Sequence, residues 1–165
     1  MDTVLLLLGL VLAAISILLY RQNSRLRKDE LTGLDTRQAL HRRRRKVCLT
    51  DGVILIDLND FKLINDRFGH QKGDECLKQV ADRLGATCRQ GDILMRWGGD
   101  EFVVILHHVD LVDVEILARR IEENCAPIPL AIGIAVQTDP LLPLDQLIDL
   151  ADKAMYADKA TKKLV

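Results

Sequence analysis

The 165-residue chain lacks the features that mark several common functional classes. Its formal net charge is only −1, so no excess of positive charge attracts nucleic acid, and we expect no nucleic-acid partner. Its four cysteines contain no CxxC pair and its four histidines show no metal-ligand spacing, so we interpret the cysteines as reduced thiols of a cytosolic domain. No repeat or low-complexity segment interrupts the chain, and its length suits one domain plus an appendage.

A long uncharged run at the N-terminus predicts the appendage. Residues 3–20 are 18 consecutive uncharged and mainly aliphatic residues, close to the roughly 20 that cross a bilayer core. Cations follow on one side only, so the positive-inside rule places the rest of the chain in the cytoplasm. A buried core helix and a cleaved signal peptide are the alternatives, although the run lacks a basic start and a small-residue cleavage site. We predict a single-pass helix over residues 1–20 in the inner (cytoplasmic) membrane, and a helical stalk over residues 21–30.

Residues 31–165 have the alternating pattern of one α+β domain. The pattern predicts four strands, at residues 53–58, 93–97, 102–106 and 130–136. The first run is continuously apolar, as expected for a strand that is buried on both faces. Stripes of helical spacing predict three helices, one beginning at Asp74 and the others near residues 114–121 and 147–154. Their order predicts a ferredoxin-like βαββαβ palm, with helices on one face of an antiparallel sheet.

An acidic turn joins two of these strands. We expect residues 98–102, Gly-Gly-Asp-Glu-Phe, to form a tight hairpin in which the glycines permit positive φ. Adjacent carboxylates at the start of a strand repel each other unless a cation or ligand offsets them. In a right-handed β-α-β-β unit, the third strand lies between the first two, so its start meets the end of the first. Asp57, the Leu58 carbonyl, Asp100 and Glu101 should therefore converge in a magnesium site that supports phosphoryl transfer.

These five letters spell the name of the GGDEF family, and four other segments resemble its motifs: residues 29–37, 57–74, 89–92 and 150–159. The resemblance implies a nucleotide-cyclase-like palm that condenses two GTP molecules to cyclic di-GMP and two pyrophosphates. It also implies Mg²⁺ or Mn²⁺ as the cofactor, with two ions per active site. The chain departs from the family pattern at Thr36 and Asn59, where Asn and Asp are usual, and at Lys163, where Arg is usual. The interval from Phe102 to Gly133 is also short for the family.

The resemblance assigns a role to each matched residue. It makes Asp57, the Leu58 carbonyl and Asp100 the metal ligands, and it places Glu101 near the attacking 3′-hydroxyl or a metal. The substrate-binding residues that it implies are Phe61, Lys62, Asn65, Asp74, Lys159 and Lys163. Asp74 favours GTP over ATP, because one carboxylate can accept from both the N1–H and the exocyclic amine of guanine. Taken singly, Asn65 and Asp74 also fit turn and N-cap chemistry, and Lys163 fits a fraying terminal turn.

A second site follows from Arg89 and Asp92, which have the spacing of the family's inhibitory product site; alone, they fit a solvated turn. By this resemblance we predict feedback inhibition by cyclic di-GMP. Because the product has twofold symmetry and each domain holds one GTP, activity should require a homodimer. The alternative function is a non-catalytic, membrane-bound cyclic di-GMP receptor that uses Arg89 and Asp92. The intact acids Asp57, Asp100 and Glu101 count against a pure receptor.

Overall fold

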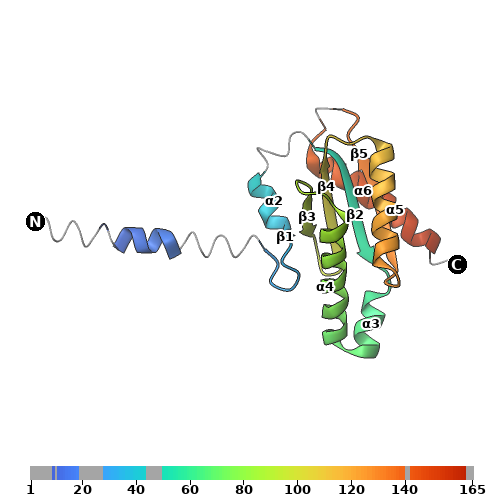
Figure 1. The fold of residues 1–165 in the computed structure, drawn as a ribbon, viewed down its shortest axis with the longest axis horizontal. Helices are drawn as coiled ribbons and strands as arrows, with labels where there is room; N and C mark the ends of the chain where they lie inside the picture. The colour runs from blue at the N-terminus through green and yellow to red at the C-terminus, as the bar shows by residue number, and fades with distance from the viewer. Residues whose placement is uncertain (1–8, 10, 19–27, 44–49, 140–141, 163–165) are drawn as a thin grey trace, which may run out of the picture.

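The computed structural model of the chain describes residues 9, 11–18, 28–43, 50–139 and 142–162 (Figure 1). Residues 11–18 are α-helical, but most of the predicted transmembrane helix and stalk lies outside the described residues. Within the described ranges, no helix is both long enough and apolar enough to cross a membrane. Lys28 forms an antiparallel bridge with Asp35, so residues 28–30, at the end of the predicted stalk, are not helical.

The domain is built on one mixed sheet of five strands in the order β1-β3-β4-β2-β5. Their bounds are β1 Asp35–Thr36, β2 Thr50–Leu58, β3 Ile93–Arg96, β4 Glu101–His107 and β5 Leu130–Val136. Strand β4 lies between β2 and β3 and is antiparallel to both, which confirms the predicted order of these three strands. The prediction of an antiparallel sheet is wrong, because the sheet also contains a parallel pair. Strand β1 pairs in parallel with β3 and was not predicted, because two residues carry no periodic pattern.

The helices described around the sheet are α2 Arg37–Arg43, α3 Phe61–Phe68, α4 His70–Thr87, α5 Leu111–Cys125 and α6 Leu144–Lys162. The prediction that a helix begins at Asp74 is wrong, because α4 begins one turn earlier, at His70. Asp74 therefore lies inside a helix and does not cap one. Gly69 separates α3 from α4 and has a φ of 84°, a conformation that glycine adopts at little cost.

Helices cover both faces of the sheet, so the predicted one-sided arrangement is wrong. Successive side chains of β2 point to opposite faces. Ile54 and Ile56 pack in a cluster with buried residues of α4 and α5, whereas Val53 and Leu55 pack in a second cluster with residues of α2 and α6. Figure 1 shows α4 and α5 on the viewer's side of the sheet and α6 behind it. The uninterrupted apolar character of β2 is the sequence signature of this two-sided burial.

Gly133 allows α6 to approach β5 closely. A Cβ atom at this position would lie 2.0 Å from the carbonyl oxygen of Ala151 and 2.2 Å from the backbone nitrogen of Met155. Both contacts are with the backbone of α6, which cannot move aside as a flexible side chain can. The absence of a side chain at Gly133 thus sets the distance between the helix and the sheet. This packing matters for function because α6 also carries Asp152, Asp158 and Lys159.

Candidate active site

The predicted convergence of acidic residues occurs at one end of β2. Asp57 lies directly across from Glu101 in the antiparallel ladder between β2 and β4. One residue further on, the backbone N–H of Leu58 donates to the carbonyl oxygen of Asp100 at 3.2 Å. Directly opposed residues in such a ladder have Cβ atoms roughly 5 Å apart. The sheet register therefore brings together residues that are more than forty positions apart in sequence.

The hairpin before Glu101 is closed by backbone hydrogen bonds, because the Trp97 N–H donates to the Glu101 carbonyl at 2.8 Å. The expectation of positive φ at its glycines is wrong, since neither Gly98 nor Gly99 lies in the left-handed region. Gly98 instead leaves room for the glutamate: a Cβ atom there would lie 2.7 Å from Oε2 of Glu101. A side chain at this position would displace the Glu101 carboxylate.

The site has a local surplus of negative charge. Burial raises the pKa of Asp100, and the neighbouring charge of Asp57 raises it further. Burial also raises the pKa of Glu101, and the charges of Asp57, Asp100 and Asp152 add to this effect. Asp152 lies on α6, far along the sequence, and nothing in the local pattern indicated its influence. Carboxylates held together in this way favour the binding of a cation.

Lys159 supplies a cation from α6. Its Nζ lies 2.6 Å from Oδ1 of Asp57, whose side chain is only 8% exposed. The positive charge of Lys159 lowers the pKa of both Asp100 and Glu101, against the larger raising effects. The structure thus brings this predicted substrate-binding lysine to the acidic site. Its contact with phosphate stays a prediction, and Lys163 lies outside the described residues.

The donor set fits a divalent cation, although the site is not a preassembled metal cage. Among the residues that the structure describes, no three histidine, cysteine, aspartate or glutamate side chains gather into a metal-binding group. The predicted ligands are instead two carboxylates, from Asp57 and Asp100, and the backbone carbonyl of Leu58. Such hard oxygens are the ligands that Mg²⁺ and Mn²⁺ prefer. Burial first, and the charges of neighbouring carboxylates second, raise the pKa of Asp100 and of Glu101, and a bound cation would offset both effects.

The predicted guanine-binding residues lie on two helices that pack closely. Asn65 is on α3 and Asp74 is on α4, and Gly73 lies where the helices meet. A Cβ atom at Gly73 would lie 2.0 Å from Oδ1 of Asn65 and 3.1 Å from the ring of Phe61. The Asn65 amide thus packs against the α4 residue that precedes Asp74. Asp74 and Lys62 are both exposed, which suits residues that contact a ligand.

Arg89 and Asp92 form a turn that is closed by hydrogen bonds between them, although the Arg89 side chain is 59% exposed. Nε of Arg89 donates to Oδ1 of Asp92 at 3.1 Å, and the Arg89 backbone N–H donates to Oδ2 at 3.0 Å. The guanidinium also donates to the carbonyl of His107. The Asp92 side chain is only 3% exposed. These residues line a cavity of about 220 Å³ together with Arg120 of α5, a cation that sequence reasoning missed because no local motif includes it.

The base of the hairpin is tied to the opening motif. Nη1 of Arg96 donates to both carboxylate oxygens of Asp29 at 3.1 Å, and Nη2 donates to the Gly99 carbonyl at 2.7 Å. Asp29 also accepts from the backbone N–H and hydroxyl of Thr32. Burial raises the pKa of Asp29, but these hydrogen bonds outweigh it and leave the pKa below its ordinary value. Sequence reasoning identified both motifs and missed this contact between them.

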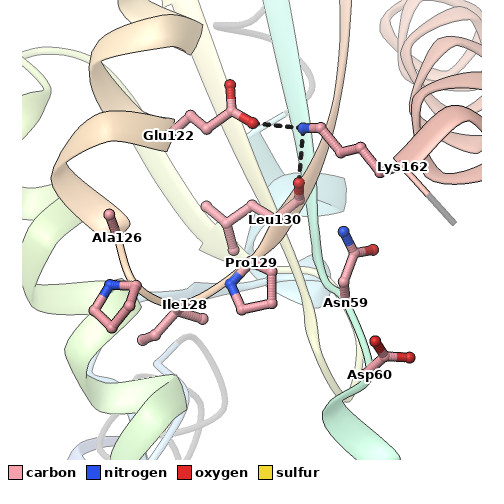
Figure 2. Close-up of a pocket in the computed structure, with 9 residues that line it drawn as sticks. Asn59, Asp60, Glu122, Ala126, Ile128, Pro129, Leu130 and Lys162 are labelled. Atoms are coloured by element: carbon pink, nitrogen blue, oxygen red, sulfur yellow. Dashed lines mark hydrogen bonds and ion pairs between the residues drawn. The ribbon is translucent and has the colours of Figure 1, made fainter. Parts of the chain in front are cut away.

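A cavity of about 780 Å³ lies near the end of β2 that carries Asp57 (Figure 2). Lys162 stands at its wall and donates to Oε1 of Glu122 at 2.5 Å and to the Leu130 carbonyl at 2.9 Å. Asn59 contributes a buried Oδ1 for which the described part of the chain provides no hydrogen-bond donor. This is the position at which the family resemblance predicts Asp.

The acidic hairpin and the mixed sheet define an α+β domain of the nucleotide-cyclase type. The model of the family described as "Diguanylate cyclase, GGDEF domain" matches residues 27–164, and the chain belongs to the GGDEF family.

Two individual proteins have sequences similar to this chain. The chain is 35% identical over 160 residues to an uncharacterised 19.3 kDa protein of Streptomyces ambofaciens, with 88% of this chain and 85% of that protein covered. It is 35% identical over 154 residues to the diguanylate cyclase DgcP of Escherichia coli K12, with coverage of 82% and 45%. The chain therefore spans less than half of that enzyme.

A solved structure gives the same result. The GGDEF domain of DgcB from Caulobacter crescentus, in complex with c-di-GMP, matches with a TM-score of 0.72 and 25% identity. The match covers 82% of this chain and 91% of that domain. The predicted family is thus confirmed, and the fold is that of a GGDEF domain.

Proposed function

We propose that this chain condenses two GTP molecules into cyclic di-GMP and two pyrophosphates. The observation that carries the proposal is the meeting of Asp57, Asp100 and Glu101 at one sheet end, with Lys159 of α6 beside them. A module that only bound the product would gain nothing from three carboxylates whose mutual repulsion must be offset. The membership of the chain in the GGDEF family supports the same reaction.

The proposed reaction uses the described residues in separate roles. Asn65 and Asp74 bind the guanine edge, and Lys62 and Lys159 neutralise the triphosphate. The 3′-oxygen of each GTP forms a bond to the α-phosphorus of the other, and at each phosphorus the bond to the leaving pyrophosphate breaks. We assign Glu101 as the acceptor of the 3′-hydroxyl proton. Glu101 lies directly across from Asp57 in the ladder between β2 and β4, so its carboxylate stands beside the predicted metal ligands, where the attacking hydroxyl would bind.

Asp57, Asp100 and the Leu58 carbonyl would hold Mg²⁺ or Mn²⁺, with two ions per active site. When bound, these ions supply charge neutralisation for the triphosphate and acidify the attacking hydroxyl. Two chains must face each other, because each contributes one GTP to a product with twofold symmetry. We therefore propose a homodimer as the active form.

Regulation and location complete the proposal. Cyclic di-GMP would bind at Arg89 and Asp92 and inhibit the enzyme, and Arg120 in the same cavity is available to the ligand. We further propose that residues 1–20 anchor the chain in the inner membrane as a single pass, with the catalytic domain in the cytoplasm. Such an anchor would raise the local concentration of partner chains and favour dimerisation.

The Glu101→Gln variant tests the catalytic assignment. It keeps the size of the side chain and removes the proton acceptor, so turnover of GTP should be lost. Binding of cyclic di-GMP, measured by calorimetry, should be retained, because Arg89 and Asp92 line a cavity to which Glu101 does not contribute. Unchanged turnover would refute the assignment. If the wild-type chain binds cyclic di-GMP but never forms it, the chain is a receptor rather than a cyclase.

A further inference from the structure

Lys159 forms a direct ion pair with Asp57, in addition to its longer-range effect on the other acids of the site. The ammonium lies 2.6 Å from one carboxylate oxygen of Asp57, and the lysine side chain is 27% exposed. Arg96, the other cation that acts on Asp100, is committed elsewhere, to Asp29 and to the Gly99 carbonyl. Of the cations that the structure describes, Lys159 is therefore the one bonded directly to an acid of the active site. Its partner is also a predicted metal ligand.

The end of α6 is fixed so that Lys159 reaches Asp57. Lys162, one turn further on, is held by Glu122 of α5, by the Leu130 carbonyl and by Asp158 at 2.9 Å. Figure 2 shows this lysine between the glutamate and the carbonyl. Oδ2 of Asp158 also accepts from the backbone N–H of Ile132 in β5 at 2.9 Å. These contacts bind the last turns of α6 to two neighbouring elements, so the approach of Lys159 is built into the fold.

A lysine ammonium and a divalent cation both require the lone pairs of the same small carboxylate, and their like charges repel at short distance. We propose that Lys159 is the counterion of Asp57 while nucleotide is absent, and that it competes with the divalent cation for this carboxylate. Nucleotide phosphate draws Lys159 away and leaves Asp57 free for the metal. Metal and nucleotide thus bind in a coupled manner through one side chain. This inference rests on the proposed function, because it takes Asp57 as a metal ligand.

The Lys159→Met substitution should have opposite effects on the binding of two ligands, Mn²⁺ and GTP. The affinity of the nucleotide-free chain for Mn²⁺ should increase about tenfold, because a competing charge near a partly exposed site is removed. The affinity for GTP in the presence of a chelator should decrease, because a phosphate contact is lost. If Lys159 had only a structural role, the substitution would lower the affinity for both Mn²⁺ and GTP. Coupling of this kind is a free-energy relation between two sites and is visible at equilibrium.

The experiment measures Mn²⁺ binding by electron paramagnetic resonance on the full-length chain in nanodiscs without nucleotide. It compares the wild type with Lys159→Met and with Lys153→Met, which removes the same charge from an exposed position on the same helix. Lys153→Met should behave as the wild type, and Asp57→Asn should lose the ion. GTP binding to the same proteins in a chelator is measured by calorimetry.

Tighter Mn²⁺ binding together with weaker GTP binding in Lys159→Met alone supports the inference. Unchanged or weaker Mn²⁺ binding in that variant overturns it, while leaving the proposed function intact. Failure of both the wild type and Lys159→Met to bind Mn²⁺ at Asp57 would refute the metal site of the proposed function itself. The two failures are therefore distinguishable.

Discussion

The contact of α6 with β5 at Gly133 permits a quantitative prediction. A Cβ atom in Gly133→Ala would lie 2.0 Å from a backbone oxygen of α6. An ordinary contact needs about 3.4 Å, so the helix must retreat by about 1.4 Å. We expect a loss of about 3 kcal/mol in the free energy of unfolding, at the upper end of over-packing costs, because the obstructing atoms are backbone. The buried residues Leu147, Ala151 and Met155 lose packing with the same movement.

The assay is urea unfolding followed by the fluorescence of Trp97, the only tryptophan of the chain. Gly85→Ala is the matched control, since Gly85 lies in α4 and a Cβ atom there meets nothing within 4 Å. The control should gain about 0.5–1 kcal/mol, because alanine favours a helix over glycine. Gly133→Ala should also lose turnover, because the displaced helix carries Lys159. Equal stability of the two variants would refute the packing argument.

Three further predictions follow from other contacts. Arg89→Ala should relieve inhibition in initial-rate assays with added cyclic di-GMP. Unchanged inhibition would refute the proposed inhibitory site at Arg89 and Asp92. Asp29→Ala should lower the free energy of unfolding, measured by urea denaturation, by about 2 kcal/mol, because Arg96 loses a charged partner. The control Lys28→Ala should change it little, because Lys28 is exposed. Asp100→Asn should raise the melting temperature at pH 7 in a chelator: a carboxyl whose folded pKa is raised opposes folding when ionised, so its removal stabilises above its raised pKa. That gain should disappear below its ordinary pKa of 3.8, and a gain that persists there would contradict the cause assigned.

Much of the topology could be predicted from the sequence, and the features that were missed have physical causes. The position of β4 between β2 and β3 followed from the handedness of the crossover, which holds for most such units. The two-sided cover of the sheet was missed, even though the uninterrupted apolar run of β2 indicates burial on both faces. Assigning the helices to one face was therefore inconsistent with that run. Strand β1 is too short to show a period, and the start of α4 was obscured by the polar residues of its first turn.

The candidate site likewise contains residues that could be predicted from the sequence and contacts that could not. Asp57, Asp100 and Glu101 could be placed together because sheet register relates distant residues by a simple rule. The influence of Asp152 and the contact of Lys159 with Asp57 depend on how α6 crosses the opposite face. Helix packing of this kind leaves no local pattern in the chain. Arg120 joins the cavity of Arg89 for the same reason, through the packing of α5.

The proposed activity of this chain is the synthesis of cyclic di-GMP from GTP. The most direct test incubates the full-length protein in nanodiscs with Mg²⁺ and either GTP or ATP, and identifies the products by mass spectrometry. Cyclic di-GMP and pyrophosphate should form from GTP, no cyclic dinucleotide should form from ATP, and Glu101→Gln should give no product. If a demonstrated dimer binds cyclic di-GMP tightly but never forms it, the chain is a receptor and not a cyclase.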